Sequence, residues 1–175
     1  MMGIAVIEFR RLTERFGEIV AVDDLTAEVR PGVITGFLGP NGAGKTTTLR
    51  MLLGLIAPSS GTATISGHPY RTLGDPIRQV GAALEASGFH PSRSARDHLR
   101  WMSIAAGLPF AAADRALDAV GLNDDARRPV GQCSLGMRQS LELASAMLGD
   151  PPVVVLDEPA NGLDPQGIRL CQHVA

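Results

Sequence analysis

The stretch Gly39-Pro40-Asn41-Gly42-Ala43-Gly44-Lys45-Thr46 decides how the rest of the chain is interpreted, because it matches the phosphate-binding loop pattern at every fixed position. Its glycines let backbone N–H groups turn inward around phosphate oxygens, which side chains would otherwise block. Lys45 supplies positive charge to the β- and γ-phosphates, and the Thr46 hydroxyl can ligate Mg²⁺. A glycine-rich turn without function is the alternative interpretation. The apolar run before the loop and the helical pattern after it favour the phosphate loop.

The segments on either side of this loop predict an α/β core. Leu49, Leu52, Leu53 and Ile56 recur at i, i+3, i+4 and i+7, which is the spacing of one buried helix face. The start of that helix would add its positive dipole end to the phosphate site. Short apolar or β-rich runs predict strands at residues 4–9, 21–29, 33–38, 62–66, 80–84 and 153–156. Strand, loop and helix followed by further apolar strands indicate a P-loop NTPase core with a mostly parallel sheet and a β-rich N-terminal part.

The middle of the chain has a different, helical character. Three apolar stripes predict helices, and their members are Ala95, Leu99, Met102 and Ala106, then Phe110, Ala113, Leu117 and Val120, then Met137, Leu141, Ala144 and Leu148. We therefore expect one domain over residues 1–175, with a core at about 1–84 and 150–175. The helical subdomain is then an insertion into that core at about 86–148.

Two further motifs follow the helical middle. Val153–Leu156 is an apolar strand that ends in Asp157 and Glu158, so Asp157 would hold Mg²⁺ and Glu158 would polarise the attacking water. Acidic residues after a strand are by themselves more often a solvated turn, but the phosphate loop upstream reverses those odds. Ser134-Leu135-Gly136 opens a helix and predicts a second anion site, although a serine N-cap alone is commonplace. The turn Asn161–Asp164 follows shortly after the acidic strand.

Composition limits the classes of function. The chain has 175 residues, 45% hydrophobic and 19% charged, with a net charge of −2. The arginines are spread along the chain, so the basic stripe of a nucleic-acid-binding protein is absent. Apolar runs fall short of the roughly 20 residues of a membrane helix, and the start, Met1–Arg11, has no signal-peptide pattern. Cys133 and Cys171 lack metal-ligand spacing. We expect a cytoplasmic domain that does not bind nucleic acid.

Taken together, these motifs resemble the ATP-binding-cassette (ABC) family over nearly the whole chain, and most closely the ATPase subunits of bacterial multidrug, antibiotic or peptide exporters. The closer similarity lies in Ala21–Leu25, Thr46–Arg50 and Ser134–Gln139. The resemblance implies that Phe16 stacks on the adenine of ATP and that Walker A spans Gly39–Thr46, with Thr47 beside it. It implies Walker B at Val153–Asp157 and a catalytic base at Glu158. ATP and Mg²⁺ are the implied ligands.

The resemblance also implies partners. Ser134 and Gly136 would belong to the signature motif, which contacts the γ-phosphate held by a second nucleotide-binding subunit, and Asp164 would lie in the D-loop at that dimer interface. The second subunit is either identical or different. Separate transmembrane permease chains would hold the protein on the inner face of the membrane. Phe89 and Trp101 are candidate anchors for this docking, although either aromatic side chain is equally compatible with a core position.

The chain departs from the family pattern at several positions. Glu85 replaces the Q-loop glutamine, and as an acid it can still face Mg²⁺. Leu135-Gly136-Met137 resembles the signature-motif variant of the exporter subset. The switch histidine of the family would follow a strand beyond residue 175, and His173, on the helix expected after Pro165, cannot replace it. His68, His90 and His98 are expected at surface or turn positions, with His98 facing outward on a helix.

These features leave three functions open. The first is the ATP-hydrolysing subunit of an exporter, which co-purification with a multi-span membrane protein would support. The second is a soluble regulatory cassette protein, although the chain lacks the tandem cassettes or long insertions usual in that class. The third is a truncated fragment that binds ATP better than it hydrolyses it, which the missing switch histidine favours. A P-loop kinase is disfavoured because the signature and D-loop motifs have no role there.

Overall fold

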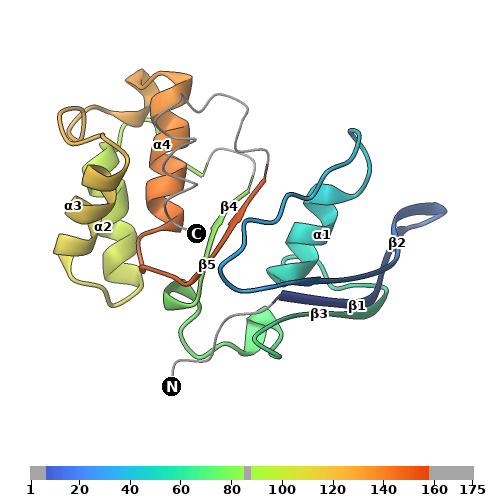
Figure 1. Ribbon diagram of the computed structural model, residues 1–175. Helices are drawn as coiled ribbons and strands as arrows, with labels where there is room; N and C mark the ends of the chain where they lie inside the picture. Colours follow the sequence, from blue (N-terminus) through green and yellow to red (C-terminus); the bar gives the residue numbers. More distant parts are fainter. Residues whose placement is uncertain (1–6, 85–87, 158–175) are drawn as a thin grey trace. The chain divides into compact units, whose positions relative to one another are not determined.

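The computed structural model describes residues 7–84 and 88–157, and these fall into two compact units divided between Pro76 and Ile77. The first unit contains three strands and one helix: β1 (Ile7–Phe16), β2 (Ile19–Val29), α1 (Lys45–Leu52) and β3 (Ser60–Ile65). The second contains two strands and three helices: β4 (Val80–Ala83), α2 (Ala95–Ala105), α3 (Phe110–Ala119), α4 (Leu135–Ala146) and β5 (Val153–Leu156). Figure 1 labels these elements.

The first unit is built on an antiparallel sheet with the strand order β2-β1-β3. β1 runs to Phe16, seven residues beyond the predicted end, because it pairs with β2 as far as Phe16↔Ile19 and with β3 from Ile7↔Ile65. Phe9, Leu12 and Ile65 bury their side chains in this sheet. The helix that follows the phosphate loop ends at Leu52, earlier than its apolar pattern suggested, and Gly54 adopts a left-handed conformation with φ 66° just after it.

The prediction of a buried strand at residues 33–38, before the phosphate loop, is wrong, because the structure has no strand there. Residues 33–38 belong to neither sheet of the described residues, and their side chains are largely exposed, 58% for Val33 and 95% for Leu38. An apolar run favours extended backbone, but a strand forms only where a neighbouring strand accepts its hydrogen bonds. Within the described part of the chain no strand pairs with this segment.

In the second unit, β4 and β5 pair in parallel with the register Val80↔Val153, as expected for the α/β core. β5 covers the predicted residues Val153–Leu156 without change, and β4 ends one residue early. Helix α4 packs closely on this strand pair, since a Cβ added to Gly81 would collide with the backbone carbonyl oxygen of Ala146. Gly81 therefore permits the helix to approach β4.

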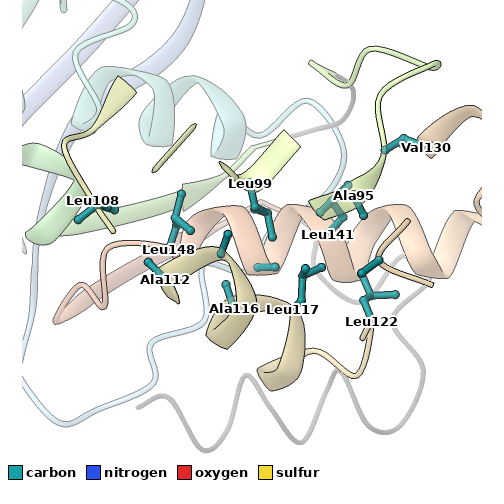
Figure 2. Packing of buried hydrophobic residues seen from close by; sticks show 13 residues of the cluster. Ala95, Leu99, Leu108, Ala112, Ala116, Leu117, Leu122, Val130, Leu141 and Leu148 are labelled. Atoms are coloured by element: carbon teal, nitrogen blue, oxygen red, sulfur yellow. The ribbon is translucent and has the colours of Figure 1, made fainter. Parts of the chain in front are cut away.

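The hydrophobic core of the second unit lies among the three helices (Figure 2). It confirms most of the predicted stripes: Ala95 and Leu99 of α2, Ala113 and Leu117 of α3, and Leu141, Ala144 and Leu148 on or after α4 are all buried. Phe110 departs from its predicted stripe, because it is the first residue of α3 and is 54% exposed. At that position the side chain lies beyond the packed turns of the helix, and the Arg100 guanidinium stacks over its ring.

His98 also departs from the prediction. The sequence predicts that His98 faces outward, but only 7% of the residue is exposed. Its ring packs edge-on against the Phe89 ring, and the two ring centroids are 4.8 Å apart. His98 precedes Leu99 on α2 and shares its buried side, and Nδ1 of His98 has no hydrogen-bond partner among the described residues. Burial, with a smaller contribution from the charge of Arg93, lowers the pKa of His98 below its ordinary value of 6.5.

This lowered pKa predicts a pH dependence of stability. Above about pH 6.5 the His98 ring is neutral in both the folded and the unfolded protein, so its burial carries no penalty for a charge. As the pH falls below that value, the unfolded chain takes up the proton first, so the free energy of unfolding should decrease until the folded ring also protonates. Denaturant unfolding between pH 7.5 and 5 should show a steeper loss for the unmodified protein than for His98→Gln. The exposed His90 provides the control variant His90→Gln, and identical pH profiles for all three proteins would contradict the prediction.

Candidate nucleotide-binding site

The predicted phosphate loop ends directly at the start of α1. A turn closes the loop, in which the Ala43 N–H donates to the Pro40 carbonyl at 3.1 Å. Gly44 is the N-cap of α1 and has no side chain to cap it, and the first intrahelical bond runs from the Thr48 N–H to the Gly44 carbonyl at 2.8 Å. The hydrogen bonds of an α-helix do not use the N–H groups of its first turn, so the start of a helix is a general binding site for anions.

Two glycines of the loop have backbone conformations that other residues rarely adopt. Gly42 has φ 83° and Gly44 has φ 82°. A Cβ at Gly42 would meet open space, whereas a Cβ at Gly44 would collide with the backbone carbonyl oxygen of Ala21 on β2. Glycine is therefore required at position 44 for two reasons. Its φ angle is unfavourable for other residues, and a side chain there would collide with the sheet.

This difference makes a testable pair of substitutions. Gly44→Ala should displace the loop from β2 and reduce ATP affinity by roughly 100-fold or more, because left-handed strain of about 1–3 kcal/mol is added to a steric clash. Gly42→Ala carries the strain alone and should reduce affinity by roughly 10-fold. Isothermal titration calorimetry with ATP would compare the two variants. Equal affinities in Gly42→Ala and Gly44→Ala would show that the contact with Ala21 is unimportant for the loop.

Lys45 already lies over its own loop. Its ammonium nitrogen Nζ donates to the carbonyl oxygens of Gly39 at 2.7 Å and Pro40 at 3.0 Å. The charge is therefore held beside the N–H groups that would receive phosphate oxygens. Thr46 and Thr47 occupy the first turn of α1 and are half-buried. Asn41 and Ala43 complete the exposed part of the loop.

Phe16 and Thr48 are two further residues of the first unit. Phe16 lies at the end of β1, in the hairpin that also carries Ala21, and is 50% exposed. Thr48 was not singled out as a site residue from the sequence. It is buried, and its Oγ1 donates to the Gly44 carbonyl at 2.9 Å, which fixes the end of the loop. Its only signal in the sequence is its position one helical turn after Gly44.

Asp157 follows β5 in the second unit. Its backbone N–H donates to the Ala83 carbonyl at 2.9 Å, so the parallel pairing extends to Asp157 and its carboxylate lies at the carboxyl end of the strand pair. Ligands of parallel sheets bind at this end of the strands. The Thr46 hydroxyl in the first unit and the Asp157 carboxylate in the second are each oxygen groups of the kind that Mg²⁺ prefers. No group of three or more His, Cys, Asp and Glu side chains that could hold a metal ion occurs in the described residues.

The predicted second anion site lies at the start of α4. Ser134 is the N-cap, and its Oγ accepts a hydrogen bond from the Met137 N–H at 3.2 Å. Gly136 lies in the first turn, and Leu135 exposes 61% of its surface. Cys133 precedes this motif as a buried thiol, and burial raises its pKa. Ser134 thus begins α4 at the surface, and Gly136 is half-buried in the first turn.

Several predicted site residues lie outside the described residues. They are Glu85, Glu158 and Asp164, together with the rest of the turn Asn161–Asp164, His173 and the helix expected after Pro165. Their roles remain predictions from the sequence. In the described residues, no helix is long and apolar enough to cross a membrane.

A glycine-rich loop that opens a helix and a parallel strand followed by an aspartate are features of a P-loop nucleotide-binding fold of the α/β class. The family model described as "ABC transporter" matches residues 22–161, and the chain belongs to this family. The bacitracin transport ATP-binding protein of Bacillus licheniformis is 43% identical over 94% of this chain and 54% of its own length. The Nod factor export ATP-binding protein I of Burkholderia lata is 41% identical over 97% of this chain and 57% of its own length. The chain thus spans about half the length of these curated relatives.

Solved structures support the same fold. An ATP-binding subunit of an ABC transporter superposes with a TM-score of 0.83 at 27% identity, over 97% of this chain and 72% of the other. An ATP-binding cassette solved as a dimer in a post-hydrolysis state with ADP and Pi also gives 0.83, at 21% identity, over 96% and 80% of the two chains. These similarities confirm the predicted ABC ATPase fold.

Proposed function

We propose that this chain binds and hydrolyses ATP to power an ABC exporter through separate membrane-spanning subunits. The observation that supports this best is the glycine-rich loop that opens α1, with the Lys45 ammonium nitrogen on the carbonyl oxygens of Gly39 and Pro40 in that loop. The printed names of two relatives, a bacitracin transport and a Nod factor export ATP-binding protein, support the export direction.

In this proposal the first unit binds the nucleotide. Backbone N–H groups of Gly42, Gly44 and the first turn of α1 surround the phosphates. The Lys45 ammonium group gives up its hydrogen bonds to the loop carbonyls and donates to phosphate oxygens instead. The exposed face of Phe16 stacks on adenine. Asn41, Ala43 and Thr47 line the same loop and helix start.

Hydrolysis would also use Asp157 of the second unit and the residue that follows it. In the family pattern, Thr46 of the first unit and Asp157 would hold Mg²⁺, with Glu85 facing the same ion. Bound Mg²⁺ would neutralise charge developing on the phosphates. Glu158 would accept the proton of the attacking water as general base, since it directly follows Asp157 at the end of β5. The roles of magnesium, Glu85 and Glu158 follow from the family pattern and the sequence.

The remaining motifs imply a dimer and a membrane partner. Ser134 and Gly136 would contact the γ-phosphate held by a second nucleotide-binding subunit, and Asp164 would lie at the same dimer interface. The dimeric cassette among the similar structures supports this arrangement. We further propose that residues 86–148 form a helical subdomain inserted into a core of residues 1–84 and 150–175, and that this subdomain contacts the permease at the inner face of the membrane.

Reconstitution tests this function. The full chain is combined with the membrane-spanning subunit of its transporter in lipid nanodiscs, and MgATP hydrolysis is measured with and without that subunit. We expect association with the loaded nanodiscs, and turnover that requires magnesium and falls to background in the Lys45→Ala variant. The exporter function would be excluded if the protein did not use ATP, or if it did not associate with the membrane-spanning subunit. Nucleotide binding without turnover would indicate the inactive fragment instead.

A further inference from the structure

The hairpin of β1 and β2 (Figure 1) extends beyond the third strand of its sheet at the end that carries Phe16. β1 pairs with β3 as far as Thr13↔Ser60, whereas its pairing with β2 continues to Phe16↔Ile19. A hairpin of two strands is only marginally stable by itself. Contacts other than the pairing with β3 must therefore hold the end of β1 if the Phe16 ring is to keep a fixed place.

Ser59, the residue before β3, holds the hairpin where its pairing with β3 ends. The backbone N–H of Ser59 donates to Oε2 of Glu14 at 2.8 Å, and the Ser59 hydroxyl donates to the same oxygen at 3.1 Å. The N–H of Arg15 donates to the Ser59 hydroxyl oxygen, also at 3.1 Å. The bonds to Ser59 thus continue the attachment that β3 provides up to Thr13, and they end one residue before Phe16.

The carboxylate of Glu14 makes this attachment strong. Only 6% of Glu14 is exposed, although Arg15 and Phe16 beside it on β1 are exposed. Burial of a carboxylate is costly unless it accepts hydrogen bonds, and bonds to an ionised group are roughly twice as strong as bonds between neutral groups. Movement of β1 away from Ser59 would leave a buried charge with fewer partners. The pair therefore favours one position of the end of β1.

The same part of the hairpin contacts the phosphate loop. Glu14 and Val22 are direct partners in the register of β1 and β2. A Cβ built on Gly44 would collide with the Ala21 carbonyl oxygen and lie 3.0 Å from the Val22 side chain, so the loop packs against β2 at this place. Gly44 caps the start of α1, and Ser59 follows its end. The hairpin is therefore attached to the chain both before and after α1.

We propose that Ser59 and Glu14 are positioning residues for the base of the bound nucleotide. They hold the end of β1 so that Phe16 meets the base at a fixed place relative to the phosphate loop, and they act through the Phe16 ring. This inference rests on the proposed function, in which Phe16 stacks on adenine. Stacking requires a defined arrangement of the two rings. A loosened hairpin would therefore lower the affinity for the base and leave the phosphate contacts unchanged.

Comparison of ATP with inorganic tripolyphosphate tests this role, because tripolyphosphate has the phosphates of ATP and no base. Isothermal titration calorimetry with the full chain and magnesium measures both affinities. Ser59→Ala and Glu14→Gln should each weaken ATP binding by roughly 5- to 10-fold, a part of what base–aromatic stacking contributes. Their affinity for tripolyphosphate should be unchanged. Ser59→Thr keeps a hydroxyl at this position and should bind ATP like the unmodified protein.

A double-mutant cycle gives a second readout that does not depend on tripolyphosphate. Phe16→Ala removes the stacking ring and should weaken ATP binding by roughly 10-fold or more. Ser59→Ala added to Phe16→Ala should then cause no further loss, because the hydroxyl acts through the ring. The matched controls are Ser60→Ala, at the next serine along the chain, and Glu28→Gln, at an exposed carboxylate of β2. Both controls should bind ATP like the unmodified protein.

The outcomes separate this inference from the proposed function. If the unmodified chain binds neither ATP nor tripolyphosphate, the proposed function fails and the inference fails with it. If Ser59→Ala loses affinity for both ligands equally, or loses ATP affinity in the Phe16→Ala background as well, the function stands and Ser59 has only a structural role. Unchanged ATP affinity in Ser59→Ala would also overturn the inference. Ser59 is exposed, so its variants remain informative if Glu14→Gln does not fold.

Discussion

Replacement of Lys45 by alanine is expected to abolish detectable ATP binding while the fold remains intact. The ammonium group is the positive charge of the phosphate loop, and it would form charge-assisted bonds with the β- and γ-phosphates. Such bonds contribute about 1.5–3 kcal/mol each, so losing two of them lowers affinity by roughly 100-fold or more. Among the described residues Lys45 donates to two carbonyls of its own exposed loop, so its loss should change the free energy of unfolding by about 1 kcal/mol or less.

Two measurements check this expectation together. Thermal unfolding with and without MgATP reports binding as a nucleotide-dependent rise in Tm. Lys45→Ala should lose this rise and keep nearly the Tm of the nucleotide-free protein. Arg50→Ala is the matched control, because Arg50 is an exposed cation at the other end of α1. Nucleotide-dependent stabilisation that survives in Lys45→Ala would contradict the assignment of the phosphate loop.

Much of the second unit could be predicted from sequence patterns. β5 was predicted residue for residue, because an uninterrupted apolar run bounded by Pro152 and Asp157 fits a buried parallel strand. The start of α4 was predicted from Ser134, whose side chain caps the helix locally. In both segments the determining interactions lie within a few residues of each other. Local patterns are therefore sufficient there.

Other features depend on contacts that no local pattern contains. The run 33–38 has the composition of a strand, but pairing decides whether a strand forms, and none of the described strands pairs with it. His98 was expected at the surface because histidine is polar, but it shares the buried side of α2 and packs against Phe89. Phe110 fits an apolar stripe by spacing, yet as the first residue of its helix it lies outside the core.

The candidate site shows the same division. The residue types of the phosphate loop, including Lys45 and Thr46, follow from its motif, because the backbone geometry of that loop is set by its own glycines. The reason that Gly44 in particular must lack a side chain is the Ala21 carbonyl on β2, which is more than 20 residues away in sequence. Such a contact is visible only once β2 and the loop are placed together.

Replacement of Glu158 by glutamine is expected to have the second large effect, this time on turnover. Glutamine keeps the shape of the side chain and removes the group that would accept a proton from the attacking water. Loss of a general base slows a reaction by roughly 10²- to 10⁴-fold, while ATP affinity should change little because Glu158 is not needed to hold the phosphates. Steady-state MgATP hydrolysis and ATP titration, both with the full chain and its membrane-spanning subunit, measure the two quantities.

Asp157→Asn provides the comparison that separates base from metal ligand. Asp157 lies at the carboxyl end of β5, where its carboxylate would hold Mg²⁺, so its loss should weaken the magnesium dependence of nucleotide binding as well as turnover. Glu158→Gln should instead retain magnesium-dependent binding and accumulate an ATP-bound dimer, since the two subunits close on ATP that they cannot hydrolyse. Light scattering after gel filtration with ATP would detect this dimer. Unchanged turnover in Glu158→Gln would move the general base to another residue, because a catalytic carboxylate cannot lose its charge without a loss of rate.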